Sequence, residues 1–197
     1  ASHDTSLKYR KQSQWNLAIK EAVWTEIVKE KIYQQRLFLE ELKKKGAMLL
    51  KQYQENVESG DRTNREGHAA KVYFNALFGM EFFRGMDDPI NAALNYGYSI
   101  LLAAMSREIT ALGYSTQLGI CHDNQFNPFN LACDLMEPFR ILVDRMVFEL
   151  PAGDFNTEAK HTLLNVLNRE VRINGNREYV SKAIRIYAKS VCDALEE

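Results

Sequence analysis

The residues best suited to chemistry gather in one short stretch, "GICHDNQFNPFNLACDLMEPFR". It holds the imidazole of His122 and, further along, the carboxylates of Asp134 and Glu137. Two carboxylates and one imidazole make an oxygen-rich ligand set with a single nitrogen, which suits Mg²⁺ or Mn²⁺. A lone histidine is more often structural or exposed than a ligand, so the pattern alone gives a hypothesis of a metal site.

The cysteines Cys121, Cys133 and Cys192 raise the alternative of zinc, because thiolates prefer softer ions. That alternative is less favoured, since Cys121 directly precedes His122 and adjacent loop residues usually point apart. An odd number of cysteines without a CxxC pair indicates a reducing compartment rather than a disulfide framework. We therefore expect a cytoplasmic protein.

The spacing of Asp134 and Glu137 puts both carboxylates on one face if the helix is continuous. Pro138 cannot donate a backbone hydrogen bond and crowds the carbonyl of Asp134, so the helix must kink or restart there. The simpler alternative is that both carboxylates are solvated and that Pro138 begins a new helix. Spacing by itself favours this alternative.

Two further polar residues, Glu66 and His68, lie in "TNREGHAAKVYF". Thr63 and Glu66 have the spacing of a capping box, in which the Glu66 carboxylate would bond the Thr63 amide and not a metal. His68 is compatible with a second ligand, a phosphate donor or a surface group. The lysines and arginines of the long first helix alternate with glutamates, and we expect them to form mostly a solvated face.

Helical periodicity dominates the chain and predicts an all-α fold, with one domain over residues 1–197. Asp88 as N-cap, Pro89 after it and Gly113 at the end mark one helix clearly, and its apolar faces predict that it is buried at the centre. The tight turn Asn-Gly should join two very short strands. The expected helices cover residues 16–45, 63–83, 88–113, 127–150, 157–170 and 177–194.

Composition limits the classes of function. The net charge of −1 carries no bulk signature of a nucleic-acid binder, so any DNA site must be a local basic patch. No apolar run is long enough to span a bilayer, and the first residues lack the apolar segment of a signal peptide. The sequence also lacks a phosphate-binding glycine loop, a G-x-S-x-G motif and an H-E-x-x-H motif.

Four segments in a fixed order resemble the CRISPR-associated integrase-endonuclease of spacer acquisition, most closely the branch found in type II systems. The segments are "REGHAAKVYFNALFG", "LNYGYSILLAAMSREI", "GICHDNQFNPFNLACDLMEPFR" and "LVDRMV". In that family a small N-terminal β-domain precedes a helical catalytic domain. The resemblance implies that this chain is the helical domain alone, with the β-domain absent.

The resemblance also implies a site. The family's metal ligands are a glutamate on one helix, a loop histidine and an acidic residue on the next helix, which match Glu66, His122 and Glu137. Asp134 would lie behind these ligands or hold another water or ion, and Pro138 would help to turn Glu137 toward the metal. Candidates for contacts to DNA phosphates are Arg140, Asn124 and Asn127.

The implied reaction is phosphoryl transfer supported by Mg²⁺ or Mn²⁺, in which the 3′-hydroxyl of prespacer DNA attacks a phosphodiester of the CRISPR repeat. With water in place of the hydroxyl, the same site would nick DNA. The implied partners are DNA, a second copy of the protein and a small ferredoxin-like subunit. Because much of the family's dimer contact lies in the β-domain, we expect this chain alone to dimerise weakly or differently.

Two alternatives stay open from the residues. An HD-type phosphohydrolase would use His122 and Asp123 together with His68 and Asp144. A helical interaction module would use all of these polar residues as caps and surface groups. The side-chain positions discriminate between the three interpretations.

Overall fold

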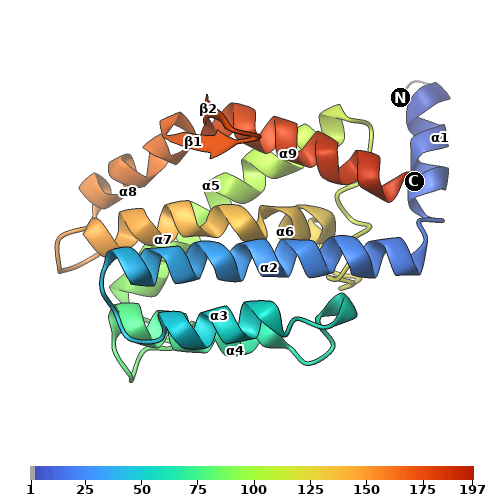
Figure 1. Cartoon of the computed structure of the whole chain (residues 1–197). Helices are drawn as coiled ribbons and strands as arrows, with labels where there is room; N and C mark the ends of the chain where they lie inside the picture. The colour runs from blue at the N-terminus through green and yellow to red at the C-terminus, as the bar shows by residue number, and fades with distance from the viewer. Residues whose placement is uncertain (1–2) are drawn as a thin grey trace.

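The computed structural model describes residues 3–197, with side chains from Ser6 onward. Helices account for most of the described chain, as predicted (Figure 1). The helices are α1 (His3–Gln12), α2 (Leu17–Glu41), α3 (Ala47–Glu55), α4 (Arg65–Phe78), α5 (Pro89–Ala111), α6 (Asn130–Met136), α7 (Arg140–Glu149), α8 (Thr157–Leu164) and α9 (Val180–Leu195), with 3-10 turns η1 (Ser59–Asp61), η2 (Glu137–Phe139) and η3 (Asn165–Asn168).

The sheet in the described chain is a two-stranded hairpin, which confirms the all-α class. Strand β1 (Glu170–Ile173) pairs antiparallel with β2 (Asn176–Tyr179). The turn residues Asn174 and Gly175 both have positive φ, +50° and +78°, as a two-residue hairpin turn requires.

The helix with the clearest sequence signals is also the one found where expected. Asp88 caps α5 by accepting the backbone N–H of Asn91 at 2.8 Å, and Pro89 is its first residue. The helix packs against α6, α7, α8 and α9, which confirms its place at the centre of the core. No helix within residues 3–197 combines the length and apolar character needed to cross a membrane.

Several boundaries differ from the expected ones. The helix expected over residues 16–45 ends at Glu41, because Lys43 (φ +53°) and Gly46 (φ +104°) turn the chain before α3 begins. Neither α1 nor α3 was expected. The next helix, α4, ends at Phe78 rather than near Phe83, since Gly79 at φ +104° leaves the helical region.

The helix that precedes Pro138 also begins later than expected. Asn127 does not cap a helix: its side chain accepts the backbone N–H of Phe129 at 3.0 Å in a local turn, and α6 begins at Asn130. The break at Pro138 is confirmed, since the 3-10 turn η2 separates α6 from α7.

Helix α2 runs along the length of the molecule (Figure 1). It contacts α3, α4 and η1 as well as α6, η2, α7 and α9. Residues that are far apart in sequence therefore share this one helix as a neighbour, and it is the element that can bring their side chains together.

The close packing of α5 against α7 generates a first prediction. A Cβ atom on Gly97 would lie 2.4 Å from Cγ1 of Val143, so the two helices meet only because residue 97 has no side chain. We expect Gly97→Ala to lower the free energy of unfolding by about 1–3 kcal/mol. Adding Val143→Ala should recover part of that loss, because the new methyl group occupies the vacated space.

Urea denaturation of the two single variants and the double variant measures this coupling. If the effects of Gly97→Ala and Val143→Ala simply add, the contact between the two residues is not what limits the approach of the helices.

Candidate metal centre

Two of the three predicted ligands meet at one lysine of α2. The ammonium of Lys31 donates hydrogen bonds to the carboxylate of Glu66, at the start of α4, and to that of Glu137, in η2. The Lys31 side chain is only 11% exposed. Two carboxylates that are far apart in the sequence therefore face the same cation in a sheltered position.

The capping-box interpretation of Glu66 is wrong. Asn64 caps α4, in the left-handed conformation, and Asp61 accepts the backbone N–H of Glu66 at 3.0 Å. The amides at the start of the helix are thus satisfied by neighbours on the N-terminal side. The Glu66 carboxylate bonds Lys31 instead of the Thr63 amide, which is the orientation that a ligand requires.

Glu137 is buried and ionised, so the interpretation of solvated carboxylates is also wrong. Its second oxygen accepts a hydrogen bond from Nε of Arg140 at 2.9 Å. Burial disfavours the charged form, but the charges of Lys31 and Arg140 lower the pKa of Glu137 below its usual range. Burial likewise opposes the charge of Lys31, and the charges of Glu137 and Glu66 nevertheless raise its pKa.

Asp134 organises the loop that carries His122. This carboxylate is fully buried and accepts the backbone N–H groups of Ile120 (2.7 Å), Cys121 (3.1 Å) and His122 (3.0 Å). It also lies 2.5 Å from Nδ1 of the His122 ring. A histidine held by a carboxylate through one ring nitrogen presents the other, here Nε2, to a ligand, as metal-binding histidines commonly do.

Gly119 allows the loop to pass this close to Asp134. A Cβ atom there would lie 2.2 Å from the carbonyl oxygen of His122 and 2.8 Å from Oδ2 of Asp134. The His122 ring also packs edge-on against Trp24 of α2, with 6.1 Å between ring centroids. The ring is therefore fixed from two sides.

The surroundings of the loop raise the pKa values of both the His122 imidazole and the Cys121 thiol. The hydrogen bond with Asp134 raises the pKa of His122 most, burial opposes it, and the carboxylates of Asp134, Glu137 and Glu66 add to the rise. Burial, followed by the charge of Asp134, raises the pKa of Cys121 to about 11. The raised pKa keeps this thiol protonated at neutral pH.

The three predicted ligands are not gathered into one set. Among the described residues, no group of three His, Cys, Asp or Glu side chains is arranged to hold a metal ion. Glu66 and Glu137 meet at Lys31, and His122 is bound to Asp134. Both halves rest on α2, because Trp24 and Lys31 are two turns apart on one face.

Hard carboxylate oxygens with one oriented imidazole nitrogen are the donor set that Mg²⁺ or Mn²⁺ uses. The position shared by Glu66 and Glu137 also holds a cation here, the ammonium of Lys31. The chemical types of these donors therefore suit a divalent metal, and two of the three, Glu66 and Glu137, already face one cation.

The other predicted residues have more local roles. His68 is exposed, with its ring 6.1 Å from that of Tyr53. The side-chain oxygen of Asn124 accepts the backbone N–H of Phe126 at 2.9 Å, so both Asn124 and Asn127 shape the loop.

Asp144, which an HD-type phosphohydrolase would need as a ligand, is buried, whereas His68 is exposed. It accepts hydrogen bonds from the hydroxyls of Tyr73 (2.9 Å) and Tyr98. Tyr98 in turn lies under Arg140, with 4.5 Å from the guanidinium carbon to the ring centroid. Asp144 thus supports the group that pairs with Glu137, and the ligand set of the HD alternative is not brought together.

Lys31 was missed by the sequence reasoning, which assigned the basic residues of this helix to a solvated face. For Lys31 that assignment is wrong. The available signal was its position seven residues after Trp24 and three after Val28, on the stripe that is buried in the structure.

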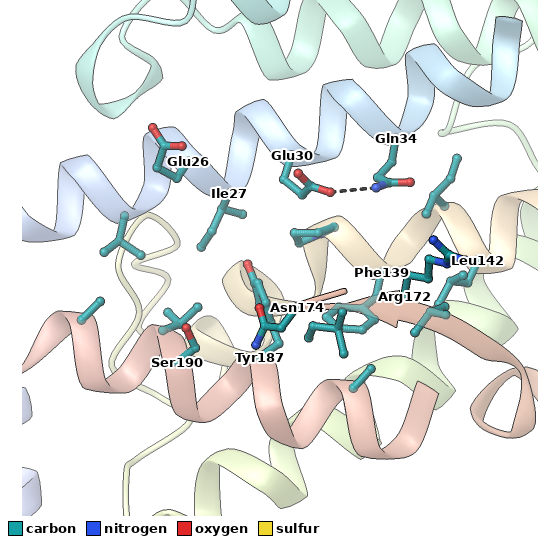
Figure 2. A pocket seen from close by; sticks show the side chains of 18 of the residues that line it. Glu26, Ile27, Glu30, Gln34, Phe139, Leu142, Arg172, Asn174, Tyr187 and Ser190 are labelled. Carbon is teal, nitrogen blue, oxygen red and sulfur yellow. Dashed lines mark hydrogen bonds between the residues drawn. The ribbon is translucent and has the colours of Figure 1, made fainter. Parts of the chain in front are cut away.

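A groove of about 870 Å³ lies beside η2, between α2, α7, α9 and the hairpin (Figure 2). Pro138 and Phe139 line it, and the Phe139 ring packs 5.3 Å from that of Tyr187. None of the three predicted ligands lines the groove, so it is distinct from the cluster around Lys31.

The hydrogen bonds of Asp134 generate a second prediction. In the unaltered protein, the two carboxylate oxygens of Asp134 accept three backbone N–H groups. Asp134→Asn keeps only one acceptor oxygen, so at least one buried N–H loses its partner. We expect a loss of about 1–3 kcal/mol in the free energy of unfolding. The amides of Ile120, Cys121 and His122 should exchange with deuterium faster than in the unaltered protein.

Asp123→Asn is the matched control, because Asp123 is exposed in the same loop and the change removes the same charge. Unchanged exchange of the three amides in Asp134→Asn would contradict the role of Asp134 in holding the loop.

The buried Asp144 generates a prediction about pH. Burial raises its pKa to about 6 from 3.8, against the opposing hydrogen bonds from the tyrosines. A raised pKa means that its contribution to stability is complete below pH 3.8 and is lost as the pH rises through 6. The difference amounts to about 3 kcal/mol.

About half of this loss falls between pH 5 and pH 8. We therefore expect the free energy of unfolding of Asp144→Asn to fall less between these two pH values than that of the unaltered protein. Urea denaturation at both pH values measures the change. If the free energy of unfolding falls equally with pH in the two proteins, the titration of the buried Asp144 carboxyl is refuted.

Comparison with known proteins supports the resemblance read from the sequence. Residues 2–174 match the family model described as "CRISPR associated protein Cas1". The CRISPR-associated endonuclease Cas1 of Neisseria meningitidis serogroup C (strain 8013) is 43% identical over 133 residues, covering 67% of this chain and 44% of that protein. This chain spans about half the length of the curated relatives it matches.

Two solved structures share the fold. One is entitled "Casposase bound to integration product", with a TM-score of 0.76 and 20% identity over 98% of this chain and 69% of that one. The other is a "Partial Cas6-RT-Cas1--Cas2 complex", with a TM-score of 0.79 and 20% identity over 99% of this chain and 72% of that one. Because the family model matches well over half of its residues, this chain belongs to the CRISPR-associated Cas1 family.

Proposed function

We propose that this chain carries the phosphoryl-transfer centre of a metal-dependent DNA endonuclease and integrase. The observation that carries the proposal is the meeting of Glu66 and Glu137 around one cation, near a loop in which Asp134 fixes His122. The curated relative is named an endonuclease, and the casposase structure holds an integration product. Both names agree with this chemistry.

In this proposal Glu66, Glu137 and Nε2 of His122 hold Mg²⁺ or Mn²⁺. The bound ion would supply positive charge to the phosphate oxygens as negative charge develops on them. Glu137 is already ionised before the ion arrives, because Lys31 and Arg140 lower its pKa. Asp134 holds the His122 ring so that Nδ1 is occupied and Nε2 remains for the ion.

Arg140 is the group of this chain that we expect to contact the scissile phosphate. Its Nε is bound to Glu137, and a guanidinium has further N–H donors on its two terminal nitrogens. Those donors match the geometry of phosphate oxygens. The packing on Tyr98, which Asp144 supports, fixes the plane of the guanidinium.

In the reaction, the 3′-oxygen of prespacer DNA forms a bond to a phosphorus atom of the repeat. The bond from that phosphorus to the repeat's own 3′-oxygen breaks. The attacking hydroxyl gives up its proton, and the departing oxygen takes one up, so charge is conserved. With water as the nucleophile the same displacement nicks the strand.

We propose DNA, a second copy of the protein and a small ferredoxin-like subunit as partners. The solved structure entitled "Partial Cas6-RT-Cas1--Cas2 complex" has the same fold, and its title supports a partner subunit. Because the net charge is −1, DNA binding requires a contribution from partners or from a local basic patch. We also propose that a β-domain precedes this helical domain in the whole protein.

The proposed ligands generate a prediction for the full-length protein. Glu66→Gln, Glu137→Gln and His122→Ala each remove one donor and little packing, so each should abolish detectable Mn²⁺ binding at this site. Each should also lower integration of prespacer DNA by about 100-fold or more. Isothermal titration with Mn²⁺ and a gel assay of strand transfer measure the two effects.

Glu30→Gln and His161→Ala are matched controls, because both residues are exposed and neither belongs to the cluster. Circular dichroism should show unchanged helix content in all five variants. Full integration by any one of the three site variants would remove that residue from the proposed site.

A further inference from the structure

We propose that Lys31 is a tethered cation that occupies the metal position between Glu66 and Glu137 and has to leave it when the metal binds. The inference rests on the proposed function and assigns a role to a residue outside the predicted ligand set. Lys31 would thereby set the affinity of the site for its metal.

The contacts of Lys31 place it between the ligands. Its Nζ donates to Oε1 of Glu66 and to Oε2 of Glu137, which belong to two different elements. The side chains of Lys31 and Glu137 are 11% and 6% exposed. An ion that binds Oε1 of Glu66 and Oε2 of Glu137 directly would lie close to the position of the ammonium, because its donor atoms must be about 2.0–2.2 Å away.

Both oxygens of Glu137 already bind a cation. Oε1 accepts the hydrogen bond from Arg140, and Oε2 accepts the one from Lys31. A metal ion on either oxygen would lie close to the cation already bound there, so the metal competes with one of these two cations. Arg140 is also packed on the ring of Tyr98, whereas Lys31 is held by the two carboxylates themselves, so Lys31 is the one that moves.

The charges lead to the same conclusion. Two carboxylates face two cations, Lys31 and Arg140, so this group of four side chains is neutral without a metal. A divalent ion adds two positive charges at the same position, and mutual repulsion at a poorly solvated site is strong. Moving the ammonium outward on its flexible four-carbon stem relieves that repulsion.

The test is a Mn²⁺ titration of the full-length protein and its Lys31→Met variant. Methionine keeps most of the volume of the stem and removes the charge. We expect Lys31→Met to bind Mn²⁺ at least about tenfold more tightly, because a competing cation is gone. Lys29→Met is the matched control, since Lys29 pairs with Glu26 on the surface of the same helix.

Equal or weaker Mn²⁺ binding by Lys31→Met would overturn the inference. The Glu66→Gln variant separates this outcome from failure of the site itself. Binding that is lost in Glu66→Gln and unchanged in Lys31→Met rejects the role of Lys31 alone. Absence of Mn²⁺ binding in every protein rejects the metal site, and the role of Lys31 with it.

A second measurement uses the unaltered protein and so does not depend on the folding of a variant. Reductive methylation, read by mass spectrometry, reports how accessible each lysine amine is. Without metal, Lys31 should react much more slowly than Lys29, and Mn²⁺ should raise the labelling of Lys31 and leave that of Lys29 unchanged. Labelling of Lys31 that Mn²⁺ does not change would overturn the inference.

Discussion

The ion pairs of Lys31 with Glu66 and Glu137 are the interaction on which the rest of the site depends. The carboxylates of Glu66 and Glu137 lie at the starts of different elements, like charges repel each other, and Glu137 is almost fully buried. Removing one partner of a buried ion pair typically costs about 3–5 kcal/mol, because the other charge is left uncompensated. The ammonium therefore fixes the start of α4 and the η2 turn against the middle of α2.

Helix α2 acts as the common support for both halves of the candidate site. Trp24 packs against the His122 ring, and two turns later Lys31 binds the two glutamates. The helix has few sequence features that suggest function, since it has no histidine and its acids are mostly exposed. Its functional importance comes from the elements that it contacts on two sides.

The sequence predicted well those features that a short segment determines. The caps and proline of α5, the Asn-Gly hairpin and the break at Pro138 each depend on a few adjacent residues, and each was found where expected. Features set by distant residues were not predictable in this way. The capping box at Glu66 has correct spacing, but Asp61 supplies the amide partner and Lys31 attracts the carboxylate. The burial of Lys31 likewise depends on partners that lie far along the chain.

The break at Pro138 explains how one short stretch serves both halves of the site. Asp134 lies on α6 and points to the loop that holds His122, whereas Glu137 is on the 3-10 turn that follows and points to Lys31. Residues three apart on a continuous helix would share one face. The tighter turn at η2 lets these two carboxylates bind different partners, and α7 then begins with Arg140 placed to bind Glu137 from the other side. The proline thus divides one acidic pair into a carboxylate that orients the imidazole and a carboxylate that faces the cation.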